Sequence, residues 1–406
     1  MTWDVDYLRD NRDENMGFLS KTLLPDGTEI PGTNFDYNYL QHRKVDVVSS
    51  ALDFILPFEK YKITAGAKVS FTNTRNGINY DTSDPTLVQD DYFRYKEQIY
   101  ALYADYSREY SERFSMQLGL RMEHTCTTGI SEAKDTEDKH DYTRLFPTVY
   151  LLYSPTDGHA LNFSFSNRIS RPSQNMVNPF PFYQNKYTYA CGREDLKPSY
   201  TYNAELGYTL KNNFNVSAYY SYSDDVFFQV VDLDAETNVT SFLWENFMKT
   251  HAFGLNNSYT FRTKWLQAYA QHGVSYRRTT SSAVTTSPEE KGWAYDASLR
   301  NTFFFNEKKT LLATLSGSYS SRQYQGIYLM SPTYSVSAGM LYRLLDNKLN
   351  LSLNVNNLFV SHSKLETMSN GLKIIADNQF SFTSFRIGVS LSLIHISEPT
   401  RRSYIS

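Results

Sequence analysis

The side chains that could do chemistry are scattered along this chain and form no catalytic pattern. None of the eight histidines falls in a His-x-His or His-Glu-x-x-His spacing, which would bring two imidazoles onto one metal ion. The abundant serines include no Gly-x-Ser-x-Gly turn that would expose a nucleophile, and no glycine-rich loop could cradle a phosphate. We therefore expect no catalytic residue and no cofactor, and we predict that the protein is not an enzyme.

One acidic run offers the oxygen ligands that calcium prefers. It contains Asp135, Glu137, Asp138 and Asp141, but it lacks the spaced Asp-x-Asp-x-Asp-Gly pattern of a calcium-binding loop. A charged outer loop is usually just solvated, so we expect no metal site here.

Residues 171–198 form the stretch that most suggests ligand binding. Four prolines stiffen it, and its aromatic rings could stack on sugars or on aromatic chelates. The alternative is that these rings only fold the stretch over the mouth of the protein. The candidate ligand-binding residues are Phe180, Phe182, Tyr183 and Tyr187.

The segments that flank this stretch are typical of strands. In residues 159–166 and again in residues 215–222, apolar side chains alternate with Asn, Ser or Tyr. A period of two is that of a strand with one apolar face and one polar face. Residues 171–198 separate the first strand from the second, whereas only residues 211–213 separate the second from the third.

Most of the chain repeats this unit, so short turns alternate with long polar connections. Two strands for each short turn, with one more at each end, give about sixteen strands. The short turns lie near residues 58–60, 111–112, 156–158, 212–213, 263–264, 306–307 and 346–347. The long connections are residues 75–91, 127–141, 171–198, 279–291, 320–331 and 361–378.

Strand length and loop asymmetry predict an outer-membrane barrel. Most of the alternating segments exceed ten residues, and a tilted spanning strand needs about 9–11, whereas soluble strands cluster near 5–6. Short turns on one rim and long loops on the other are typical of such barrels and not of a soluble sandwich. No run of about 18 apolar residues predicts a transmembrane helix. The tryptophans that could join interfacial aromatic girdles are Trp3, Trp244, Trp265 and Trp293.

The overall composition excludes one class of partner and leaves the cysteines open. Lys+Arg 40 against Asp+Glu 43 gives a net charge of −3, which lacks the basic footprint of a nucleic-acid-binding protein. Cys126 and Cys191 both fall in long connections on the same rim. We expect two free thiols, and a disulfide between neighbouring loops is the alternative.

Both ends of the chain look artificial. The opening MTWDVDYLRD already alternates like a strand and has no signal-peptide pattern, so we expect Met1 to be an internal methionine or a fragment boundary. Residues 391–401 read LSLIHISEPTR, which resembles the translation of an adapter used in preparing sequencing libraries. We therefore assign residues 1–390 to a partial outer-membrane barrel and residues 391–406 to a tail that is not native.

Five short motifs in a fixed order resemble the outer-membrane β-barrel family, which is related to TonB-dependent receptors and typical of Bacteroidetes-type bacteria. They are YTRLFP (142–147), RISRP (168–172), NPF (178–180), Gly192 followed by LKP (196–198), and ELGY (205–208). FRYKEQIYALYADYS (93–107), LGLRMEHT (118–125) and NVNNLF (354–359) add to the similarity. One departure is Gly-Arg-Glu-Asp at 192–195, where the family often has Gly-Asn-Pro, and this loosens a turn.

The resemblance implies a transmembrane, antiparallel, up-and-down barrel of 22 strands with an N-terminal plug in its lumen. This chain would supply about sixteen of those strands, without the plug and without about six N-terminal strands. The implied parent is a receptor in the outer membrane of a Gram-negative bacterium. Its implied partners are outer-membrane lipid, the TonB complex acting through the plug, and an unidentified nutrient (a chelate, glycan or peptide), with no nucleic acid.

Two other interpretations stay open. One is a barrel without energised transport, which would act as a passive pore or as a scaffold for adhesive loops. The other is a soluble all-β binding protein, which the strand length disfavours.

Overall fold

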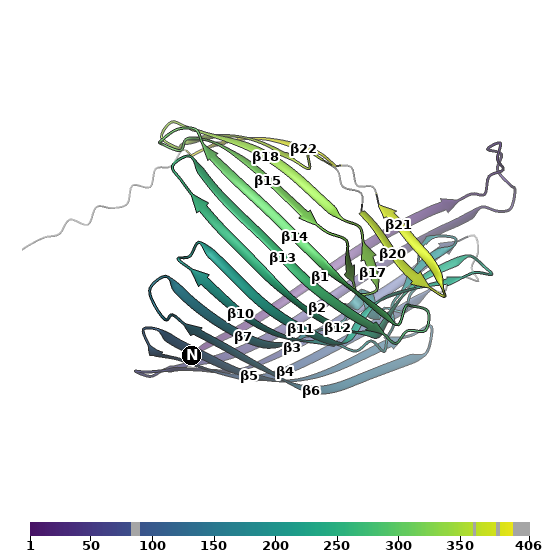
Figure 1. Ribbon diagram of the computed structural model, residues 1–406. Coiled ribbons are helices and arrows are strands. Elements are labelled where there is room, and N and C mark those ends of the chain that lie inside the picture. The colour runs from purple at the N-terminus through teal and green to yellow at the C-terminus, as the bar shows by residue number, and fades with distance from the viewer. Residues whose placement is uncertain (83–89, 360–362, 379–381, 393–406) are drawn as a thin grey trace, which may run out of the picture.

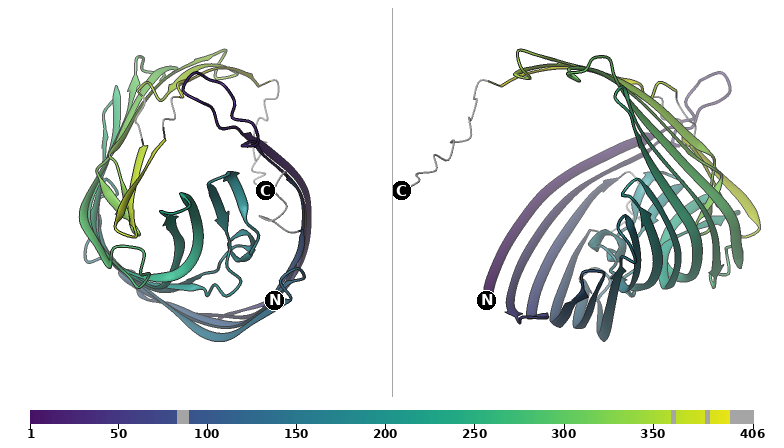
Figure 2. Two further views of the ribbon diagram at one scale, coloured as in Figure 1. Left: turned by 90° about the vertical axis from the view of Figure 1, so that its right-hand side faces the viewer. Right: turned by 60° about the vertical axis from the view of Figure 1, so that its left-hand side comes forward.

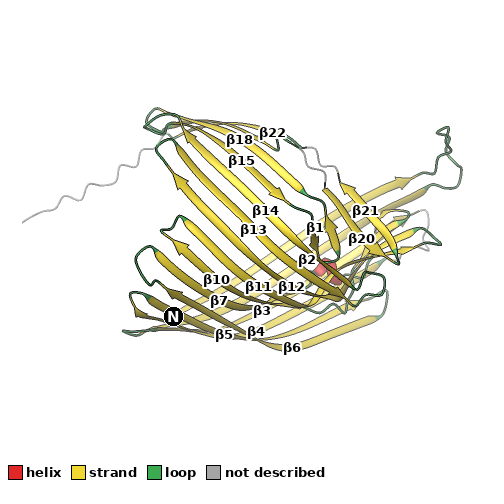
Figure 3. Ribbon diagram, viewed as in Figure 1, coloured by secondary structure: helices red, strands yellow, loops and turns green. Residues whose placement is uncertain are grey.

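The computed structural model describes residues 1–82, 90–359, 363–378 and 382–392, and most of these residues lie in β-strands (Figures 1 and 3). Within the described residues, sixteen antiparallel strands form a wall, which confirms the predicted all-β antiparallel fold class and the expectation of about sixteen strands in this chain. Among the described residues, no helix is long and apolar enough to cross a membrane. The wall strands are β1 (Thr2–Ser20), β2 (Phe35–Pro57), β3 (Lys62–Thr82), β4 (Asp91–Ser111), β5 (Phe114–Ser131), β6 (Thr136–Tyr153), β7 (His159–Ser170), β10 (Ser199–Leu210), β11 (Phe214–Asp234), β12 (Val239–Arg262), β13 (Leu266–Ser281), β14 (Glu289–Phe304), β15 (Leu311–Ser320), β18 (Thr333–Leu344), β19 (Leu349–Asn356) and β22 (Ser384–Leu391).

Each wall strand pairs with the wall strands before and after it in the chain, which is up-and-down topology. The wall curves around an interior, as the end-on view in Figure 2 shows. Within the described residues, the strand pairings join β1 only to β2 and β22 only to β19. The wall therefore has two strand edges in this chain, and no ladder of hydrogen bonds joins them among those residues.

Side-chain exposure follows the predicted alternation. On β5, Leu118, Leu120 and Met122 are exposed on the outer face, whereas Glu123 and Thr125 on the inner face are buried. An apolar outer face and a polar inner face are typical of a strand that spans an outer membrane.

The predicted tryptophan girdle needs one correction. Trp3, Trp265 and Trp293 are exposed, as side chains at a lipid interface would be in an isolated chain. Trp244 is not, because its ring packs against Phe227 and Phe228 with centroids 6.4 Å away in each case.

Several strands run further into the long-loop rim than the sequence predicts. β5 and β6 stay paired up to Ser131 and Thr136, so residues 127–141 are a strand hairpin and not the predicted long loop. Cys126 therefore lies in a strand, contrary to the prediction. The reason is that an antiparallel ladder needs only paired backbone groups, which polar threonine-rich segments supply as well as apolar ones.

Two groups of short elements fold into the mouth at the long-loop rim (Figure 2, left). The first comprises α1 (Gln174–Val177), which is the small red helix in Figure 3, with β8 (Phe182–Asn185) and β9 (Thr188–Cys191). The second is a four-stranded sheet of β16 (Gln323–Gln325), β17 (Tyr328–Met330), β20 (Ser363–Ser369) and β21 (Leu372–Asn378). Of the predicted tail, residues 393–406 lie outside the described residues.

Candidate functional site

Three of the four candidate aromatic residues pack against the inner face of the wall. Phe180 is 2% exposed and Tyr183 is 9% exposed, and both belong to one apolar cluster with side chains of β2, β3 and β4. The ring pairs are Phe180–Phe93, Tyr183–Tyr37 and Phe182–Tyr39, with centroids 6.3, 5.2 and 5.8 Å apart. Because residues 171–198 begin after β7 and end before β10, these contacts hold the stretch across the interior.

The fourth candidate, Tyr187, lies in the turn between β8 and β9 and is 47% exposed. Gln184, Asn185 and Lys186 beside it are exposed as well, and the Lys186 ammonium lies 5.8 Å from the centre of the Tyr187 ring. Backbone contacts hold this tip, because β9 pairs in parallel with β12 and the Thr240 amide donates to the Tyr187 carbonyl at 2.7 Å. The tip thus presents amides, an ammonium and an aromatic face to the solvent in the mouth.

Hydrogen bonds also join the two halves of residues 171–198 to each other. The Gly192 amide donates to the Asn178 carbonyl at 2.9 Å, and the approach is so close that a Cβ on Gly192 would lie 2.2 Å from that oxygen. The Cys191 thiol donates to the Pro179 carbonyl at 3.1 Å, and burial raises the pKa of this thiol. Both cysteines, Cys126 and Cys191, are free.

A group of buried charges anchors the start of the stretch. Arg171 pairs with Glu123 of β5, which is only 5% exposed, and its guanidinium also lies 3.7 Å from Glu97 of β4. Arg121 donates two further hydrogen bonds to Glu123, at 2.6 and 2.9 Å. Two arginines thus face two glutamates, so the group is neutral overall. Such a buried group is costly to break because the remaining charge loses its partner.

A cavity of about 540 Å³ opens in the wall beside this group. Its exposed lining is mostly apolar, and the charged side chains of Lys68, Asp105, Arg121 and Glu123 also border it. A cavity of this size, with a mostly apolar lining and a few charged groups, falls in the range of small-molecule sites. The protein therefore combines an exposed tip in the mouth with a cavity on the inner wall that is mostly apolar and bordered by charged side chains.

The acidic run lies on the β5–β6 hairpin. Two of its members pair with neighbours on β6, as Glu137–Lys139 and Asp138–His140, at 2.9 and 2.8 Å. Asp141 lies instead beside His124 and Cys126 of β5. This group shows no spacing signal in the sequence, because its members come from two strands. The hairpin register, in which Cys126 faces Asp141, is the signal that could have shown it.

Comparisons with known proteins agree with the fold. Residues 1–392 match the model of the outer membrane protein beta-barrel family. No curated protein matches the chain in sequence.

Similar solved structures include the copper transporter OprC (TM-score 0.59, 13% identity), the ferric citrate transporter FecA in its unliganded form (0.57, 12%) and the ferric yersiniabactin uptake receptor FyuA from Yersinia pestis (0.57, 14%). They cover 86%, 95% and 93% of this chain, which in turn spans 60%, 62% and 57% of their lengths. At such low identity this likeness concerns the fold alone. The family match locates the protein in the outer membrane, and the chain belongs to the outer membrane protein beta-barrel family.

Proposed function

We propose that this chain is the barrel portion of a TonB-dependent outer-membrane receptor, which takes up a chelate, glycan or peptide too large for simple porins. The solved structures of the same fold include a copper transporter, a ferric citrate transporter and a ferric yersiniabactin uptake receptor. In this proposal the rim with the long connections faces the outside, as in other outer-membrane barrels.

The observation that carries the proposal is the placement of residues 171–198. The stretch lies inside the mouth, in the path of a solute that enters from outside, and the exposed tip around Tyr187 is its accessible part. An aromatic face beside amide and ammonium donors suits ring-bearing, hydrogen-bonding nutrients. Phe180 and Tyr183 support the tip by packing, and Phe182 is half-buried beside them.

The competing function is a passive pore or an adhesive scaffold. A passive pore needs an open water-filled lumen, whereas two groups of short elements fold into the mouth here. To distinguish the two functions, the gene is deleted in its own host and restored on a plasmid. Growth on limiting nutrients identifies the nutrient, and uptake of that nutrient is then measured with and without a proton gradient. Uptake that stops when the proton gradient is collapsed supports the receptor, and uptake that continues supports the pore.

The variant Tyr187→Ala tests the tip. Loss of one aromatic contact in a binding site costs about 1–2 kcal/mol, so the half-saturating nutrient concentration should rise roughly tenfold. Tyr187→Phe keeps the ring and is the matched control. Unchanged uptake by Tyr187→Ala, at normal surface abundance, would reject a recognition role for this residue.

A further inference from the structure

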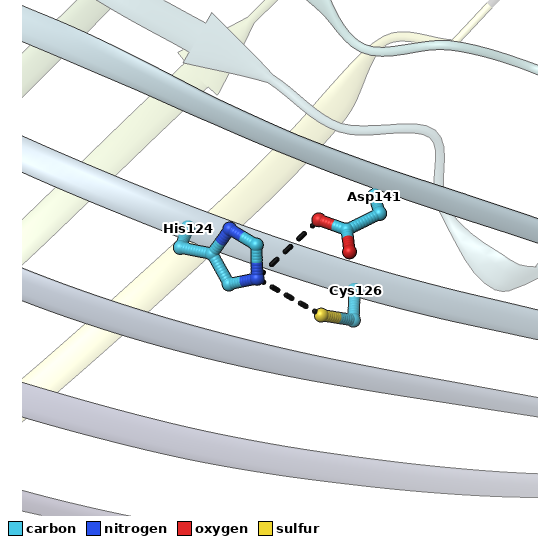
Figure 4. A group of neighbouring side chains, drawn as sticks. All are labelled: His124, Cys126 and Asp141. Carbon is cyan, nitrogen blue, oxygen red and sulfur yellow. Dashed lines mark hydrogen bonds and ion pairs between the residues drawn. The ribbon is translucent and has the colours of Figure 1, made fainter.

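Three metal-ligating side chains converge on the outer face of the β5–β6 hairpin (Figure 4). His124 and Cys126 are two residues apart on β5, and alternate residues of a strand share a face. Asp141 of β6 is the direct cross-strand partner of Cys126, which places their Cβ atoms about 5 Å apart. The pairing register of one hairpin thus brings an imidazole, a thiol and a carboxylate to a single point.

The distances between the donor atoms fit one ion. His124 Nε2 lies 3.3 Å from Cys126 Sγ and 3.3 Å from Asp141 Oδ1, and the three donor atoms all lie within 4.8 Å of one another. Ligands bound tetrahedrally to zinc at about 2.0–2.3 Å lie about 3.3–3.7 Å apart. The two contacts of the imidazole already have the length of a tetrahedral edge, so little movement is needed to admit the ion.

The imidazole is held in the orientation that a metal ligand requires. Its other nitrogen, Nδ1, lies 2.9 Å from the Thr143 hydroxyl, and Thr143 is the cross-strand partner of His124. The ring of Tyr100 packs beside it, with centroids 6.3 Å apart. Histidines that bind metal usually hold their second ring nitrogen in such a hydrogen bond, which leaves Nε2 directed at the ion.

The group is open to solvent and lies beyond the apolar band of the outer wall. His124 and Cys126 continue the outward row of Leu118, Leu120 and Met122 toward the long-loop rim. The side chains of His124 and Asp141 are 41% and 69% exposed. An ion could reach the group from outside without entering the barrel.

We propose that His124, Cys126 and Asp141 bind a borderline transition-metal ion, with zinc as the expected one. One nitrogen, one sulfur and one oxygen ligand match the donors that zinc takes, and three protein ligands leave a fourth position for water or for an external ligand. The bound ion would join β5 to β6 above the membrane. This site lies on the outer wall and does not depend on the proposed uptake function.

Cobalt(II) is the probe, because a cobalt–thiolate bond gives a charge-transfer absorption band that reports the sulfur directly. The full chain in detergent micelles should bind one cobalt ion with this band, and added zinc should abolish it. Cys126→Ser should abolish the band, and His124→Ala or Asp141→Asn should each weaken binding by at least about tenfold.

The chain supplies matched controls. Cys191→Ser removes the only other cysteine and should keep the band, and His140→Ala removes a histidine of the same hairpin that pairs with Asp138 and should keep the affinity. Circular dichroism confirms that each variant retains its strands. The proposal is overturned if folded wild-type chain shows no thiolate band, if Cys191→Ser loses it, or if folded His124→Ala and Asp141→Asn bind cobalt as tightly as wild type.

Discussion

Replacement of Arg171 by alanine tests whether buried charge holds residues 171–198 inside the mouth. Glu123 is 5% exposed and has two guanidinium partners, and the variant removes one of them. Breaking a buried ion pair costs about 3–5 kcal/mol when the other charge is left alone. Because Arg121 still donates two hydrogen bonds to Glu123, we expect a smaller cost of about 2–3 kcal/mol.

Hydrogen exchange of the Gly192 amide measures this cost, since that amide donates to the Asn178 carbonyl only while the stretch is folded. In the opened stretch Glu123 becomes solvated, so the whole cost appears in the opening equilibrium. Exchange should accelerate roughly 30- to 150-fold in Arg171→Ala.

The matched control is Arg193→Ala in the same stretch. Arg193 pairs with Asp195 and Glu245, but its side chain is 49% exposed, and exposed ion pairs contribute about 0–1 kcal/mol. If the Gly192 amide exchanges no faster in Arg171→Ala than in Arg193→Ala, the buried charges do not hold the stretch in place.

Three further predictions concern other parts of the fold. Gly192→Ala should destabilise the chain by about 1–3 kcal/mol in urea titrations, because its Cβ would lie 2.2 Å from a carbonyl oxygen, whereas Gly77→Ala meets nothing nearer than 3.6 Å and should be almost neutral. Leu206→Arg puts a charge on the exposed apolar face of β10 and should cost up to about 4 kcal/mol of folding free energy in lipid vesicles. Glu205→Arg, on the opposite face, should cost less, and an equal loss of folding free energy in the two variants would contradict this assignment of faces. Burial raises the pKa of Tyr328 in the mouth sheet to about 12, so its contribution to stability is fully present below about pH 10 and is lost as pH rises toward 12. Tyr328→Phe should reduce this loss by about 2 kcal/mol, and an unchanged pH profile would refute the assignment.

The wall of the barrel could be predicted from the sequence because its signal is local. Each spanning strand carries its own period-two pattern, as Leu118, Leu120 and Met122 alternate with Gly119, Arg121 and Glu123. The short turns mark where one strand ends and the next begins. Strand number and rim asymmetry follow from these two signals.

The ends of the strands and the packing of the mouth were not predictable in the same way. Polar extensions such as residues 127–141 show no apolar face, although their backbone ladder continues. Phe180 packs inward against side chains of β2 and β4, which come more than seventy residues earlier in the chain. The exposed tip at Tyr187 is held by the backbone of β12, about fifty residues later. The group of His124, Cys126 and Asp141 depends in turn on the register of one hairpin, which composition does not reveal.

The membrane assignment requires that the apolar face of each wall strand contacts lipid, and spin-label accessibility tests this contact directly. Single cysteines at positions 205 and 206, introduced into a chain that carries Cys126→Ser and Cys191→Ser, can each take a spin label after insertion into lipid vesicles. The label at Leu206→Cys should collide mainly with oxygen dissolved in the bilayer, and the label at Glu205→Cys mainly with a water-soluble nickel chelate. Equal accessibility at the two positions, or the reverse order, would contradict an outer face in hydrocarbon and an inner face in water.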